Sequence, residues 1–168
     1  MEEKVLLNAT LLFPVWEGYV ALARKKAKIG AGCWNGYGGD IEDDEDVTAA
    51  SVRECFEESG LRINTRYLEK IALIDFHNQK RDETFFTCRV HVFRAREWYG
   101  QPCETEKMGP PEWFRISRLP LNEMMPADRE WLPRALAGEK LYGEFWYGPF
   151  QKELICPSVV RVVPAFDV

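Results

Sequence analysis

The sequence lacks the features that mark several specialised classes of protein. No stretch approaches the roughly 20 consecutive apolar residues that a membrane-spanning helix requires. The first residues have neither the basic start nor the long apolar run of a signal peptide, and the five cysteines include no C-x-x-C pair. Repeats and low-complexity segments are also absent. We therefore expect a soluble protein of the reducing cytoplasm, without a membrane partner and with one domain over residues 1–168.

The chain also lacks an excess of positive charge. The chain has 22 basic and 27 acidic side chains, for a net charge of −5, which argues against a protein that coats duplex nucleic acid. The negative charge is unevenly distributed, because residues 40–58 contain nine acidic side chains and only one basic one, Arg53. This segment carries −8, which leaves +3 for the rest of the chain.

The hydrophobic pattern predicts an α/β fold in which helices cover a mixed β-sheet. Predicted strands span residues 5–13, 18–23, 68–76, 84–96, 141–150 and 154–163, and predicted helices span 47–59 and about 127–136. Asp46 is a suitable N-cap for the first helix, and Gly60 supplies the left-handed stop after it. The glycine-rich segment 30–39 is expected to be a loop before this helix.

Three glutamates in the first predicted helix are the main candidates for chemistry. Glu54, Glu57 and Glu58 stand at i, i+3 and i+4, so a helix places all three carboxylates on one face. A solvated charged face is the commonest explanation of such a run. Their repulsion is relieved by a cation or by raised pKa values, and oxygen ligands suit Mg²⁺ or Mn²⁺ better than zinc. Arg53 is spaced to pair with Glu57 and orient it.

A longer pattern over residues 39–61 contains these glutamates. It runs from Gly39 through five residues to Glu45, then through seven residues to R-E-C-F-E-E-S-G-L. The pattern resembles the Nudix box, G-x5-E-x7-R-E-U-x-E-E-x-G-U, and all seven fixed letters match. Cys55 alone departs from it, as a small hydrophobe in place of a bulky aliphatic residue. The resemblance implies the Nudix fold, an α/β/α sandwich, and hydrolysis of a nucleoside diphosphate linked to another group.

The resemblance also implies roles for individual residues. Glu57 and Glu58 are expected to be the main metal ligands, and Glu54 a further ligand or the base that activates water. Glu45 is expected to orient the loop. The other implied metal contacts are the backbone carbonyl of Gly38 and a downstream glutamate, either Glu104 or Glu106. The expected metal is Mg²⁺, with Mn²⁺ as a substitute.

Similarity to the MutT-related branch of the family extends over most of the chain. It is carried by G-A-G-C-W-N-G-Y-G-G from Gly30, V-H-V-F at 90–93, W-F at 113–114 and P-A-D-R-E-W-L-P from Pro126. This branch implies a purine substrate, whose edge the Asn35 amide and the Asp128 carboxylate would read. Lys25 is placed to contact phosphate. The other matching pocket positions are Thr10, Ile29 and Trp131.

Four positions depart from that branch. Ala127 stands where the branch has a second aspartate, and Met125 replaces a tryptophan that covers the base. Asp40 replaces a lysine after the glycine pair, and Ile29 replaces an aromatic residue. These departures affect recognition of the base and leave the Nudix carboxylates intact.

We therefore hypothesise Mg²⁺-dependent hydrolysis of an oxidised purine nucleoside triphosphate to monophosphate and pyrophosphate, in sanitation of the nucleotide pool. The acidic segment would then be a cation site that bridges to the nucleotide. Removal of pyrophosphate from an RNA 5′ end and cleavage of a dinucleotide polyphosphate are the enzymatic alternatives. A nucleotide-sensing domain without hydrolysis is the alternative of another class, but it usually accompanies loss of the glutamates, and none is lost here.

Overall fold

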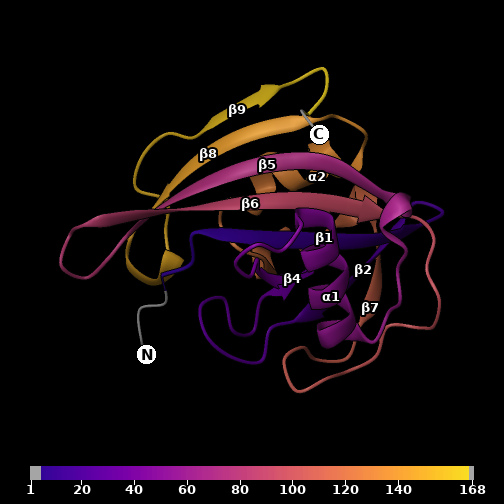
Figure 1. Cartoon of the computed structure of the whole chain (residues 1–168). Helices are drawn as coiled ribbons and strands as arrows, with labels where there is room; N and C mark the ends of the chain where they lie inside the picture. Colours follow the sequence, from indigo (N-terminus) through magenta and orange to yellow (C-terminus); the bar gives the residue numbers. More distant parts are fainter. Residues whose placement is uncertain (1–4, 167–168) are drawn as a thin grey trace.

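A computed structural model describes residues 5–166 (Figure 1). The strands are Asn8–Trp16 (β1), Tyr19–Arg24 (β2), Trp34–Asn35 (β3), Tyr37–Asp40 (β4), Leu68–Gln79 (β5), Phe85–Ala95 (β6), Glu112–Arg115 (β7), Leu141–Tyr147 (β8) and Val159–Val162 (β9). The α-helices are Val47–Ser59 (α1) and Asp128–Leu136 (α2).

The strands form one mixed sheet in the order β3-β2-β1-β6-β5-β8-β9, with β4 paired to β1 and β7 paired to β2. The β1–β6 and β5–β8 pairs are parallel, and the remaining pairs are antiparallel. In Figure 1, α1 lies in front of the sheet over β1 and β4, and α2 lies behind it. The predicted α/β/α sandwich with a mixed sheet is therefore confirmed.

Two apolar cores lie on the two faces of the sheet. Consecutive residues of a strand point to opposite faces, so Leu12 packs with Cys55 of α1, while Phe13 packs with Trp131 of α2. Cys55 is completely buried, as expected for the one departure from the box. Each helix is thereby held against the sheet by its own apolar side.

Helix α1 begins and ends where the sequence predicts. The Asp46 carboxylate accepts hydrogen bonds from the backbone N–H groups of Thr48 and Ala49, at 3.1 and 3.2 Å. Gly60 has a left-handed φ of 80° and donates its N–H to the Phe56 carbonyl. These caps fix the helix ends and so the positions of the glutamates near its C-terminal end.

The first strand lies three residues further along the chain than predicted. Pro14 was expected in the connection after residue 13, but it lies inside β1, in register with Ala95 of β6. Pairing with β6 carries the strand past the proline. The turn that follows consists of Glu17 and Gly18, with φ of 49° and 82°.

The last strand pair is shorter than predicted. Strand β8 ends at Tyr147 because Pro149 opens a 3-10 turn in which Phe150 has a φ of 60°. Leu154 forms only an isolated bridge to Tyr147, and regular pairing resumes at Val159. In the opposite sense, the glycine-rich segment expected to be a loop contains both β3 and β4.

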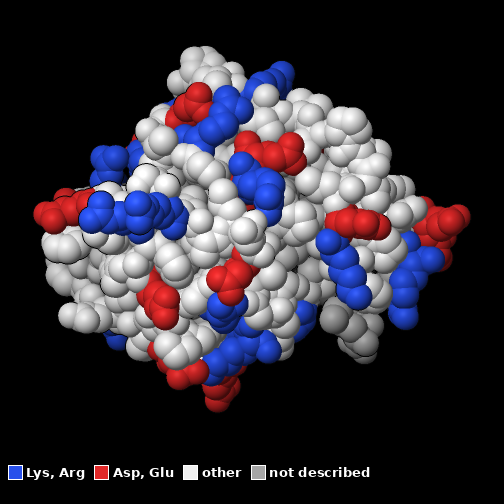
Figure 2. All heavy atoms as spheres, turned by 180° about the vertical axis from the view of Figure 1, so that it is seen from behind, with Lys and Arg blue, Asp and Glu red and all other residues white. Residues whose placement is uncertain are grey.

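Charged groups of both signs lie close together on the face seen from behind (Figure 2). This face therefore offers no continuous field of one sign to a polyanion. Within residues 5–166, no helix has the length and apolar character needed to cross a membrane.

The N-cap of α1 gives a first testable prediction. Replacing Asp46 by alanine removes both backbone hydrogen bonds of the cap, so the free energy of unfolding should fall by about 1 kcal/mol, or about 2–4 °C in Tm. Asp43→Ala is a matched control, because this exposed acid lies in the same loop and its loss should cost less than about 0.5 kcal/mol. Equal losses in chemical denaturation of the two variants would contradict the role of the cap.

Candidate active site

Arg53 is the centre of the charged cluster on α1. Its guanidinium donates to both carboxylate oxygens of Glu45, at 2.7 and 2.8 Å, and to Glu54 at 3.0 Å. It also contacts the Asp40 carbonyl at 3.0 Å and Glu57 at a longer 3.4 Å. The predicted Arg53–Glu57 pair is therefore the weakest of these contacts. Glu45 is the main partner, as suits a residue that orients the loop.

The mutual effects on pKa follow from this arrangement. Hydrogen bonds from Arg53 lower the pKa of Glu45 to about 2, and the backbone N–H of Glu42 adds to this effect. The pKa of Arg53 is raised in turn, chiefly by Glu45 and also by Glu54. The arginine is thus a permanent cation that holds carboxylates from the loop and from the helix.

Glu58 lies on the buried side of the same helix, next to strand β4, which contains Gly38 and Gly39. Its Oε1 accepts the Gly38 backbone N–H at 2.8 Å. Burial raises the pKa of Glu58 to about 7, the Gly38 hydrogen bond opposes this rise, and the Glu54 carboxylate adds to it. The negative charge of two buried carboxylates close to each other is an electrostatic environment that a cation would relieve.

The backbone of β4 also approaches Glu54 closely. A Cβ atom placed on Gly39 would lie 2.5 Å from Glu54 Oε2, so any other residue here would require this carboxylate to move. The acidic side chains beside β4 offer carboxylate oxygens, which are the ligands that Mg²⁺ and Mn²⁺ prefer. The donor set therefore fits the divalent cation that the sequence predicts, with Glu54 and Glu58 nearest to β4.

The remaining predicted metal contacts lie further out. Glu57 is half-exposed and also contacts Lys107 at 3.5 Å, while Glu104 is exposed and pairs with Lys26 at 2.8 Å. Glu106 is exposed as well. Within residues 5–166, no three His, Cys, Asp or Glu side chains are arranged as a metal-binding group, while Arg53 and the Gly38 N–H form hydrogen bonds with the carboxylates of α1. The choice between Glu104 and Glu106 stays open.

The predicted base-reading residues come from three different elements. Asn35 is in β3, and its side-chain oxygen accepts the Gly36 N–H at 2.8 Å. Asp128 begins α2, and its Oδ2 accepts the Met125 N–H at 3.2 Å. Lys25 donates its ammonium to the Ile29 carbonyl at 2.7 Å. The side chains of Lys25 and Met125 both lie close to Gly30. Met125 is therefore near the loop that contains Ile29.

Asp128 is the most perturbed acid of this group. Burial raises its pKa to about 7, against the lowering effects of the Met125 N–H and the Trp131 indole. Its charge also helps to raise the pKa of Cys33, after burial itself. An aspartate with its pKa near neutrality switches between accepting and donating a hydrogen bond, which is a capacity suited to reading a base edge.

Two of the predicted pocket residues are buried more deeply than expected. Trp131 is 1% exposed and packs edge-on against Phe13, so its indole is part of the core behind the sheet. Thr10 is 3% exposed in β1, in register with Gly39, and its hydroxyl has no hydrogen-bond partner among the residues that the structure describes. That buried hydroxyl is a polar group for which a ligand or water would be a partner.

Tyr147, the last residue of β8, is a residue of this region that the sequence analysis did not single out. Its hydroxyl accepts the Ala127 N–H at 2.8 Å, and Asp128 contributes to the raised pKa of the phenol, after burial. The tyrosine thus anchors the turn that presents Asp128. The alternation of residues 145–147 signals a strand, but it does not show which partner the hydroxyl meets.

Comparisons with known proteins agree with this geometry. A NUDIX domain model matches residues 8–135. A protein of Danio rerio named oxidized purine nucleoside triphosphate hydrolase is 39% identical over 136 residues, which are 81% of this chain and 83% of that protein. The protein of the same name from Mus musculus is 36% identical over 157 residues, which are 94% of this chain and 96% of that protein.

Solved structures share the fold. The crystal structure of a MutT protein from Bacillus halodurans superposes with a TM-score of 0.74 at 24% identity, covering 95% of this chain and 99% of that one. A MutT NUDIX hydrolase from Burkholderia pseudomallei gives a TM-score of 0.65 at 24% identity, covering 77% of this chain and 97% of that one.

The raised pKa of Asp128 predicts a pH dependence of stability. The folded state holds this proton more tightly than the unfolded state, so its contribution to stability is present near pH 4 and is lost as pH rises through about 7. Asp128→Asn removes the titration, and the fall in Tm between pH 5 and pH 8 should become smaller than in the wild type. Asp82→Asn, at an exposed aspartate whose pKa is lowered, should leave that fall unchanged. Identical slopes for wild type and Asp128→Asn would disprove the assignment.

Proposed function

Because this chain belongs to the Nudix family, we propose that it hydrolyses an oxidised purine nucleoside triphosphate to the monophosphate and pyrophosphate. The predicted Nudix hydrolase is confirmed at the level of the family by the domain match and by the similar proteins. The observation that carries the proposal is the joint presence of an Arg53-centred carboxylate cluster and a buried Asp128 with a raised pKa. The first suits phosphoryl chemistry and the second suits a purine edge.

Nudix hydrolases generally use divalent metal ions. We propose Mg²⁺ here, with Mn²⁺ as a substitute, held by Glu54, Glu57, Glu58 and the Gly38 carbonyl. When bound, the metal supplies charge neutralisation for the polyphosphate and an acidified water. The all-oxygen donor set supports this choice.

The protein's own residues would supply positioning. Arg53 holds Glu54 and Glu57 on one side of the cluster, and the Gly38 N–H holds Glu58 on the other. Fixed carboxylates lose less orientational freedom when the nucleotide arrives, which is how enzymes lower the entropy cost of reaction. At the other end, the Asn35 amide and Asp128 would receive the base, and Lys25 would contact phosphate.

This activity would clear damaged nucleotides from the precursor pool, and we place it in the cytoplasm on a single domain. None of the five cysteines, all within residues 5–166, forms a disulfide, which supports a reducing compartment. RNA 5′-pyrophosphate removal, dinucleotide polyphosphate cleavage and nucleotide sensing are the competing functions.

The metal assignment predicts a large loss of activity in Glu57→Gln. Loss of residues that only hold metal ligands already costs 10–100-fold in activity, so loss of a ligand should cost more than about 100-fold in kcat. Glu57 is half-exposed, so the variant should keep the wild-type Tm. Glu139→Gln, an exposed glutamate beyond α2, is the matched control and should change kcat less than about twofold. Near-wild-type turnover in Glu57→Gln would remove this residue from the metal site.

The substrate assignment predicts an order of rates in a panel with Mg²⁺. Pyrophosphate should appear fastest from 8-oxo-dGTP or 2-hydroxy-dATP, more slowly from dGTP and slowest from dCTP, because Asn35 and Asp128 match a purine edge. Triphosphorylated RNA and diadenosine polyphosphates belong in the same panel. A preference for either would replace the proposed substrate, and binding without turnover of any compound would favour a sensor.

A further inference from the structure

A cavity of about 420 Å³ lies away from the candidate active site. It is formed where the parallel strands β1 and β6 end, beside the turn at Glu17 and Gly18 and the C-terminal end of α2 at Leu136. Asp128 is at the opposite end of α2, about 12 Å along the helix axis. The volume lies within the range of small-molecule sites, and none of the predicted catalytic or base-reading residues lines it.

Arg94 is the buried charge of this cavity. It is only 6% exposed, and it donates to Glu69 at 2.7 Å and to the Leu136 carbonyl at 3.4 Å. Its Nε has no hydrogen-bond partner within the described part of the chain. A guanidinium has five N–H donors, so this buried group makes fewer hydrogen bonds than it can, which costs free energy unless something else completes them.

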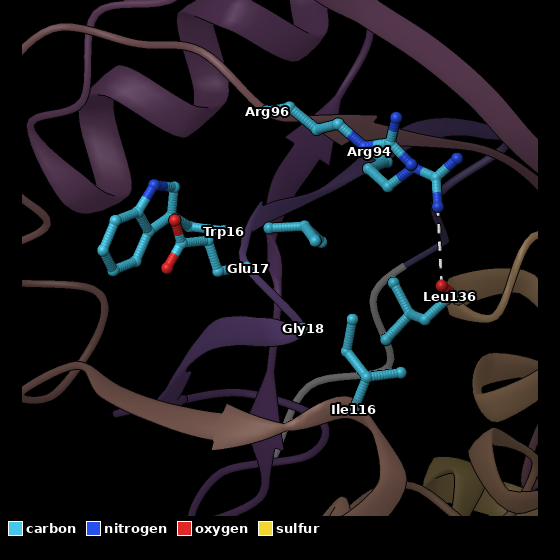
Figure 3. A pocket seen from close by; sticks show the side chains of 8 residues that line it. Trp16, Glu17, Gly18, Arg94, Arg96, Ile116 and Leu136 are labelled. Atoms are coloured by element: carbon cyan, nitrogen blue, oxygen red, sulfur yellow. Dashed lines mark hydrogen bonds between the residues drawn. The ribbon is translucent and has the colours of Figure 1, made fainter.

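Arg96 adds a second positive charge at the same end. It follows Arg94 by two residues, directly after the end of β6, and Figure 3 shows the two side chains together at one side of the cavity. Glu69 pairs with Arg94, but no carboxylate within residues 5–166 forms an ion pair with Arg96. Arg94 and Arg96 carry two positive charges, and Glu69 neutralises one of them. This end of the cavity therefore has a net positive charge that complements an anion.

Trp16 and Glu17 lie across the cavity from the two arginines (Figure 3). Trp16 is 58% exposed, so its indole offers a free face for stacking on a flat ring. The Glu17 carboxylate beside it accepts hydrogen bonds and would repel an anion, so it suits a ring that carries N–H groups. Val15, Ile116 and Leu136 supply apolar wall between the two ends.

We infer that this cavity is a second ligand site, for a small phosphorylated compound that carries a flat nitrogen heterocycle. The phosphate would lie at Arg94 and Arg96, and the ring would lie on Trp16 with its N–H groups toward Glu17. The site is separate from the proposed hydrolytic site, because the two share no residue.

Binding at this site is measured by NMR titration of the full ¹⁵N-labelled chain in EDTA, so that divalent metal does not hold phosphate at α1. The chain has six tryptophans, and the indole signal of Trp16 is identified by its absence in Trp16→Phe. The probes are dAMP, deoxyadenosine and inorganic phosphate. We expect dAMP to shift the Trp16 signal to saturation. Deoxyadenosine alone and inorganic phosphate alone should each bind with a Kd at least about tenfold higher.

Two variants distinguish binding at this site from nonspecific attraction of a negatively charged ligand to the protein. Arg96→Ala should raise the Kd for dAMP about tenfold, the cost of one charge-assisted contact. Arg161→Ala removes the same charge from exposed strand β9 at the far edge of the sheet, and it should leave Kd within about twofold. Arg96 is exposed, so its truncation does not threaten folding, whereas Arg94 is buried and paired.

Three results would overturn the inference. The first is a Trp16 signal that does not respond to dAMP while the Asn35 side-chain amide does, since binding would then be at the candidate active site. The second is an equal effect of Arg96→Ala and Arg161→Ala. The third is inorganic phosphate that binds as tightly as dAMP, which would remove the heterocycle from the ligand.

Discussion

The candidate active site depends on Arg53, because its guanidinium offsets the repulsion between carboxylates. Three glutamates within five residues of α1 would disfavour one another and the helix, yet two of them contact the same guanidinium, which also holds Glu45 from the preceding loop. Helix caps at Asp46 and Gly60 fix where α1 begins and ends, and β4 fixes Glu58 through one backbone hydrogen bond. The chain thus keeps a concentrated negative charge in a defined shape, ready for a cation.

Much of this architecture could be predicted because its causes are local. The caps, the spacing of the glutamates and the alternation in β6 are visible in short stretches of sequence, and the positions of α1 and α2 agree with the structure. The strand bounds around Pro14 could not be predicted, because pairing with β6, some 80 residues later, extends β1 past the proline. Strands β3 and β4 were missed for the same reason, since pairing partners stabilise these two short segments.

The contacts of the predicted site residues could be predicted only in part. Arg53 was expected to pair with Glu57 by helical spacing, whereas the loop residue Glu45 is nearer, because spacing rules consider only one helix. Trp131 packs against Phe13 in the core, a contact between α2 and β1 that the helical pattern alone does not give. The hydrogen bond from the Ala127 N–H to Tyr147 joins residues 20 positions apart, and no pattern in the sequence reports it.

Helix α2 presents Asp128 at one end and accepts a hydrogen bond from Arg94 at the carbonyl of Leu136 at the other. Short helices of this kind move as rigid bodies rather than by stretching. An axial shift caused by filling one end would therefore displace contacts at the other. Thermodynamic linkage then requires reciprocity: whatever factor a ligand beside Leu136 applies to nucleotide affinity at Asp128, the nucleotide must apply to that ligand.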